Sequence, residues 1–171
     1  LENTGFGKAT KFVSLLSEIA GDNYALLEVY LHGAKVGVDA KWCLFAVREA
    51  TRRNCGLLER AAAFNQTAPL DRYTASAFET VARSPALLRE LAQKTGVAAA
   101  EVAERLQSRL EGVEGLHDFM RLTGVVKERV TCVPPVEGCG MQLHDLSDEC
   151  WRLVRSYLSF DDVKPYHFMP S

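Results

Sequence analysis

The sequence predicts an all-α fold, organised as a single compact domain of about eight or nine short helices. Apolar residues recur at spacings of three and four along most of the chain, the pattern of helices with one buried face. Serine, proline and glycine stand where helices typically begin and end. The composition, 47% hydrophobic and 25% charged over 171 residues, is that of one globular domain spanning residues 1–171. We expect an irregular loop with prolines and glycines near 124–146, and a partly packed, flexible tail over 160–171.

The first predicted helix covers residues 8–20 and ends before Gly21. Its apolar face would consist of Phe12, Leu15, Leu16 and Ile19. Residues 23–32 are rich in β-branched and aromatic side chains, so two interpretations stay open. A helix is favoured, and a hairpin with residues 36–38 is the alternative.

Asp39 is a suitable N-cap for a helix over 40–54, which Cys55-Gly56 would end. Its apolar faces would come from Trp42, Cys43, Phe45, Ala46 and Val47. Shorter helices are expected over 57–64 and 71–82.

The clearest boundary is Ser84-Pro85, a serine N-cap followed by proline at the first helical position. It predicts a helix over 85–95 that ends at Gly96. The next helix, over 98–111, carries an apolar stripe of Val102, Leu106, Leu110 and Val113.

Two further helices are expected in the last third of the chain. One covers 116–123 and ends at Gly124, and 125–133 is irregular or a short strand. Ser147 caps the last helix, which reaches about Leu158.

The charge balance disfavours several functions. The net charge of −2 provides no global attraction for nucleic acid or an anionic membrane. No apolar run approaches the roughly 20 residues of a membrane-spanning helix, so no membrane partner is expected. Five cysteines, an odd number, favour a reducing compartment and therefore an intracellular, cytoplasmic or nuclear location. The sequence contains no nucleophile elbow, phosphate-binding glycine loop or His-Glu-x-x-His motif.

A structural zinc site is one hypothesis for the loop before the last helix. Cys132, Cys139, His144 and Cys150 provide three thiols and an imidazole, ligands that suit tetrahedral Zn²⁺. The alternatives are a Cys132–Cys139 disulfide and unmodified thiols. A bound zinc would make the chain a small zinc-stabilised adaptor module.

A second hypothesis concerns nucleic acid. Residues 88–106 resemble a helix-turn-helix, with Ala92 four residues before the turn glycine Gly96 and Val102 six residues after it. That resemblance implies that the second helix enters the major groove. The outward positions of this helix carry Glu101 and Glu104, whereas base and phosphate contacts call for basic or amide side chains.

A cluster of basic residues between positions 41 and 60 is the best candidate anion-binding surface. Five basic and two acidic residues give this segment a local charge of +3. The basic residues are Lys41, Arg48, Arg52, Arg53 and Arg60. Nucleic acid, a phosphate group or an acidic partner would suit it.

Aromatic residues near the C-terminus are candidate anchors for a partner protein, because aromatic side chains dominate interface energetics. They are Trp151, Tyr157, Phe160, Tyr166 and Phe168. Residues 143–163 are also similar to the first half of an F-box, which implies binding of an adaptor protein. The sequence therefore favours a non-catalytic helical protein-interaction or regulatory domain without a required cofactor, and the nucleic-acid-binding regulator is the alternative.

Overall fold

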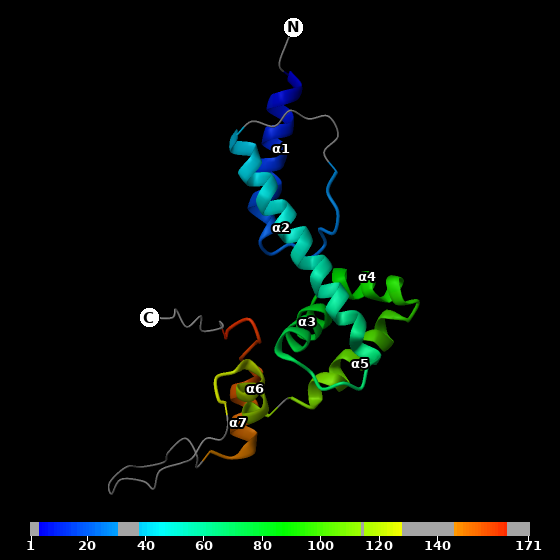
Figure 1. Cartoon of the computed structure of the whole chain (residues 1–171), viewed down its shortest axis with the longest axis vertical. Helices are drawn as coiled ribbons and strands as arrows, with labels where there is room; N and C mark the ends of the chain where they lie inside the picture. The colour runs from blue at the N-terminus through cyan, green and yellow to red at the C-terminus, as the bar shows by residue number, and fades with distance from the viewer. Residues whose placement is uncertain (1–3, 31–37, 114, 128–145, 164–171) are drawn as a thin grey trace, which may run out of the picture.

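The computed structural model describes residues 4–30, 38–113, 115–127 and 146–163. The elements are α1 (Thr4–Ala20), α2 (Val38–Ala61), the 3₁₀-helix η1 (Ala62–Asn65), α3 (Arg72–Arg83), α4 (Pro85–Thr95), α5 (Ala99–Glu111), α6 (Leu116–Thr123) and α7 (Asp148–Ser156) (Figure 1). All regular structure in these ranges is helical, which confirms the all-α fold class. Seven α-helices and one 3₁₀-helix are described where eight or nine helices were expected. None of these helices combines the length and apolar character needed to cross a bilayer.

The first two helices form an arm that extends from the rest of the molecule. In Figure 1, α1 and α2 lie side by side and run in the same direction, while residues 21–30, the return segment, lead the chain back along them. The predicted helix over 23–32 is therefore wrong for the residues up to Tyr30. Fully buried Asn54 of α2 donates hydrogen bonds to the carbonyls of Asn23 (2.8 Å) and Leu26 (2.9 Å). In a helix these carbonyls would accept hydrogen bonds from backbone amides of the same helix. Here they accept them from a side chain about thirty residues away.

α1 packs through a different face from the one expected. Val13 and Ala20 are buried, and Leu16 is partly buried against Val47 and Ala50 of α2. The remaining members of the predicted apolar face are exposed: Phe12, Leu15 and Ile19. Of that face, only Leu16 lies on the packed side, because α2 covers a single narrow side of α1.

α2 continues through Gly56, where the sequence predicted a break between two helices. Glycine in a helix interior costs about 1 kcal/mol relative to alanine. Burial of Leu58 and Ala61 beyond it outweighs this penalty, since both side chains belong to the main core. One helix therefore joins the arm to the core.

The main core lies between the second half of α2, η1, α3, α4 and α5. Its buried members are Leu58, Ala61, Phe64, Phe78, Val81, Leu87, Leu91, Val102 and Leu106. Local signals position its helices as predicted. The Ser84 side chain accepts a hydrogen bond from the Leu87 amide, and Gly96 ends α4 with a φ of 69°.

A smaller apolar cluster joins α3 to the C-terminal part of the chain. The ring centroids of Phe119 on α6 and Phe160 after α7 lie 5.1 Å apart, and both side chains pack with Ala75. The Arg155 guanidinium stacks over both rings, 4.2 Å from the centroid of Phe119 and 5.1 Å from that of Phe160.

A buried carboxylate of α3 reinforces this contact. Glu79 accepts the backbone N–H of Phe160 at 3.0 Å. It also forms ion pairs with Arg83 at 3.2 Å and Arg155 at 3.7 Å. We call Glu79, Arg83, Arg155 and Phe160 the Glu79 junction, which fastens the residues after α7 to the main core.

Candidate functional site

The basic–aromatic face of α2 is the most distinctive surface of the described residues. We define it as Lys41, Trp42, Phe45, Arg48 and Arg52, which recur at spacings of three and four and so share one side of the helix. The opposite side packs through Val47, Ala50, Asn54, Leu58 and Ala61. Trp42 is 73% exposed and Phe45 is 59% exposed, so two large aromatic side chains stand in solvent beside three basic ones. The helix is held in place from behind and presents this face outward.

The basic side chains of this face differ in whether a carboxylate of the chain already pairs with them. Arg52 forms an ion pair with Glu49 at 2.9 Å, and the hydrogen bond and negative charge of Glu49 raise the pKa of the Arg52 guanidinium. Lys41 and Arg48 are exposed and form no ion pair within the described part of the chain. These two side chains leave the face positively charged.

The other two members of the predicted basic cluster serve the fold. Arg53 donates hydrogen bonds to the carbonyls of Gly21 and Asn23, and its guanidinium lies 4.7 Å from the ring centroid of Tyr24. It therefore holds the return segment, together with Asn54.

Arg60 lies at the end of α2, with its guanidinium 5.3 Å from the ring centroid of Tyr73. Its charge also contributes to lowering the pKa of Asp71. The structure thus brings Lys41, Arg48 and Arg52 together and places Arg53 and Arg60 elsewhere.

The predicted C-terminal anchors likewise differ in their surroundings, and some are buried while others are exposed. Trp151 is partly buried, Tyr157 is 80% exposed, and Phe160 is buried in the cluster with Phe119. Phe160 is therefore a core residue rather than a surface anchor, because its backbone N–H binds Glu79 and its ring packs against Phe119 and Arg155. Tyr157 instead shares an exposed apolar face of α7 with Leu153 and Val154. Tyr166 and Phe168 lie outside the described residues.

Most of the predicted zinc site also lies outside the described residues, namely Cys132, Cys139 and His144. Cys150 is exposed in the first turn of α7, and its Sγ lies 3.5 Å from the Ser147 hydroxyl. No group of three metal-binding side chains occurs within the ranges that the structure describes. The zinc and disulfide hypotheses remain predictions.

The helix-turn-helix resemblance corresponds to α4 and α5, joined at Gly96. Val102 and Leu106 of α5 are buried in the main core. On the outer side, Arg105 pairs with Glu101 and also donates a hydrogen bond to Asn65 at 2.5 Å. The first basic side chain within α5 is thus already paired, which does not favour phosphate contact.

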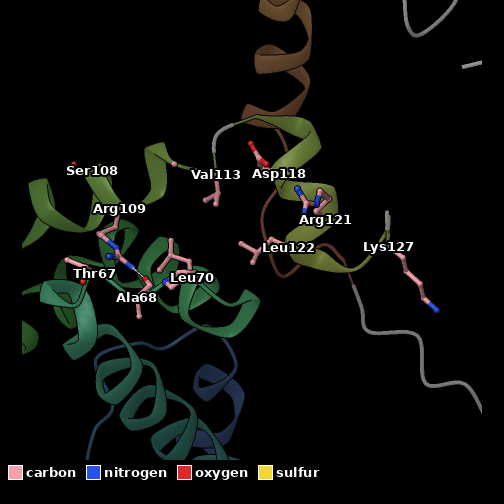
Figure 2. A pocket seen from close by; sticks show the side chains of 12 residues that line it. Thr67, Ala68, Leu70, Ser108, Arg109, Val113, Asp118, Arg121, Leu122 and Lys127 are labelled. Atoms are coloured by element: carbon pink, nitrogen blue, oxygen red, sulfur yellow. Dashed lines mark hydrogen bonds between the residues drawn. The ribbon is translucent and has the colours of Figure 1, made fainter. Parts of the chain in front are cut away.

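A cavity of about 710 Å³ opens between residues 67–70, the end of α5, and α6 (Figure 2). Arg109 crosses one side and donates hydrogen bonds to the carbonyls of Gln66 and Ala68, so it holds the connector before α3. Arg121, Lys127 and Asp118 are the other charged lining residues. In Figure 2, Lys127 points away from the other labelled side chains. Neither cysteine nor histidine occurs among the described residues that line it.

Trp42 and Phe45 are the residues that sequence reasoning missed, since it assigned both to apolar packing faces. The sequence did contain a pattern that distinguishes these two residues from the buried side of α2. Val47, Ala50, Asn54, Leu58 and Ala61 repeat at three and four and define the buried side, from which Trp42 and Phe45 are displaced. Comparisons with models of protein families, with curated proteins and with solved structures find no match for this chain.

Proposed function

We propose that this chain is a helical protein-interaction domain, and that the basic–aromatic face of α2 binds an acidic amphipathic helix of a partner protein. The observation that carries the proposal is the exposure of Trp42 and Phe45 beside Lys41 and Arg48. Large apolar side chains gathered on an exposed face are typical of interaction sites. An amphipathic helix would bury its apolar residues on the aromatic pair and place carboxylates near the basic pair.

The surroundings of the face support this choice. Tryptophan and arginine are enriched among residues that contribute most to binding. The backbone of α2 is fixed by buried Val47, Ala50 and Asn54, so binding orders no additional helix. An intracellular location is consistent with this role and remains a prediction.

A single-stranded nucleic acid is the second candidate for the same face. Basic side chains interleaved with exposed aromatics provide phosphate contacts and stacking platforms. The two candidates differ in their response to salt. Binding of nucleic acid weakens steeply with salt as counterions are released, whereas an interface anchored by aromatic burial weakens less.

Fluorescence anisotropy with two labelled probes tests the proposal. The first probe is a designed helical peptide with leucine and phenylalanine on one face and glutamate on the other. The second is a single-stranded oligodeoxynucleotide. We expect the peptide to bind, and the Trp42→Ala/Phe45→Ala variant to weaken binding roughly tenfold or more. Tyr157→Ala is the matched control, because it removes another exposed aromatic side chain, at the C-cap of α7.

The outcomes separate the candidates. Preferential binding of the oligonucleotide, with a steep salt dependence, would replace the protein partner with nucleic acid. Peptide binding that survives the double substitution but fails in Tyr157→Ala would move the site to α7. A peptide with lysine in place of glutamate should bind poorly, and equal binding of both peptides would contradict the electrostatic part of the proposal.

A further inference from the structure

α1 carries an exposed apolar stripe on a different helix from the basic–aromatic face of α2. Phe12, Leu15 and Ile19 are each more than half exposed, although α1 already packs on α2 through its other side. Their spacing of three and then four residues is that of a helix seam that packs against another helix. α1 therefore has two packing faces, and one of them has no partner among the described residues.

The charges beside this stripe indicate which partner fits it. Lys11 and Glu18 are both exposed and lie seven residues apart, each immediately before an apolar stripe residue. Since seven residues are about two helical turns, both lie on the same flank of the stripe. One flank thus carries a positive charge at one end and a negative charge at the other.

Such a flank is complementary to itself when two copies of α1 lie antiparallel. A two-fold axis beside Leu15 would bring Phe12 of each copy to Ile19 of the other. It would also bring Lys11 of each copy to Glu18 of the other. Each apolar residue then meets an apolar one, and each charge meets its opposite.

We propose that this protein self-associates as a two-fold symmetric dimer through the α1 stripe, with Leu15 at the axis and reciprocal Lys11–Glu18 ion pairs. Three apolar side chains per copy cover less than the roughly 800 Å² per partner of a standard stable interface. The dimer therefore exchanges with monomer, and its population depends on concentration. This inference uses a different helix face from the proposed partner site and does not rest on it.

Sedimentation equilibrium of the full chain over a series of concentrations tests the dimer. We expect the wild-type protein to show a monomer–dimer equilibrium, and Leu15→Asp to remain monomeric. Leu15 is exposed, so this change should leave the fold intact, and far-UV circular dichroism checks that it does. Phe45→Asp is the matched control, because it alters an equally exposed side chain on α2 and should still dimerise.

Charge exchange tests the antiparallel geometry. Lys11→Glu should weaken dimerisation roughly tenfold, since two attractive contacts become repulsive. The double variant Lys11→Glu/Glu18→Lys should restore it, because the pairs re-form with reversed signs. A wild-type protein that stays monomeric at every concentration would overturn the proposal, as would a dimer that Leu15→Asp leaves unchanged. A double variant as weak as Lys11→Glu would exclude the reciprocal ion pairs.

Discussion

The two halves of α2 belong to one helix but have different surroundings. Beyond Gly56, Leu58 and Ala61 are buried in the main core with residues of α3, α4 and α5. In the first half, Val47 and Ala50 pack against α1 and the return segment, while Trp42 and Phe45 remain in solvent. A single helix thus contributes to the main core at one end and carries the exposed aromatic side chains of the proposed binding face at the other. The half of α2 that is packed in the main core therefore fixes the position of the exposed half.

The largest expected effect is a difference in stability loss between two phenylalanine substitutions, one in the main core and one on the exposed half of α2. Phe78→Ala removes a fully buried ring from the main core, and should lower the free energy of unfolding by about 3–5 kcal/mol. Phe45→Ala removes a mostly exposed ring and should change it by less than about 0.5 kcal/mol. Urea denaturation followed by circular dichroism measures both. Similar losses for the two variants would mean that the arm is as tightly packed as the core.

A smaller effect concerns the contact that fixes the return segment. Asn54→Ala removes the side-chain donor of the Leu26 carbonyl and leaves the Asn23 carbonyl with Arg53 alone, and should destabilise the protein by about 1–3 kcal/mol. Hydrogen exchange should accelerate in the arm more than in α3 to α5. Gln93→Ala, which removes an exposed amide side chain of α4, is the control and should have little effect. A uniform acceleration across the molecule would show that the arm and core unfold together.

The smallest effect concerns the N-cap of α3. The Thr74 backbone N–H, which Asp71 accepts at 2.9 Å, lowers the pKa of the Asp71 carboxyl. A carboxyl whose pKa is lower in the folded state stabilises the fold above its unfolded pKa of about 3.9. This contribution is lost as the pH falls through the lowered pKa. Asp71→Ala should therefore cost about 1 kcal/mol at pH 7, and less in acid.

Asp71→Asn is the matched control for this effect. Asparagine still accepts the capping hydrogen bond but does not titrate. Urea unfolding between pH 7 and pH 3 should show a steeper acid loss for the wild type than for Asp71→Asn. Identical profiles would contradict a role for Asp71 ionisation in stability.

The same contrast explains what the sequence could predict. α4 was predicted correctly because Ser84, Pro85 and Gly96 act within a few residues of the helix ends that they determine. The return segment was not, because its conformation depends on Asn54, which is distant in the chain. Gly56 predicted a helix break because glycine is unfavourable in a helix interior. The burial of Leu58 outweighs this local cost, and α2 continues.

The candidate site was predictable only in part. The sequence predicted a basic cluster between residues 41 and 60, and α2 carries Lys41, Arg48 and Arg52 of that cluster on one side of the helix. Sequence periodicity could not show that Trp42 and Phe45 are largely exposed, because the same apolar residue type can be buried or exposed. Burial depends on which helices meet, and this is a property of the assembled fold.

The Glu79 junction has a consequence for the order in which this protein is made. Every fully buried residue of the main core lies between Leu58 and Leu106, so that core can assemble before the C-terminal part leaves the ribosome. The Phe160 N–H that Glu79 accepts is synthesised 81 residues later. Among the described residues made before then, Glu79 has an ion pair with Arg83, a neighbour on its own helix. Arg155 and Phe160 then give Glu79 two further partners, so the C-terminal part can close over α3 only after the residues of the main core have been synthesised.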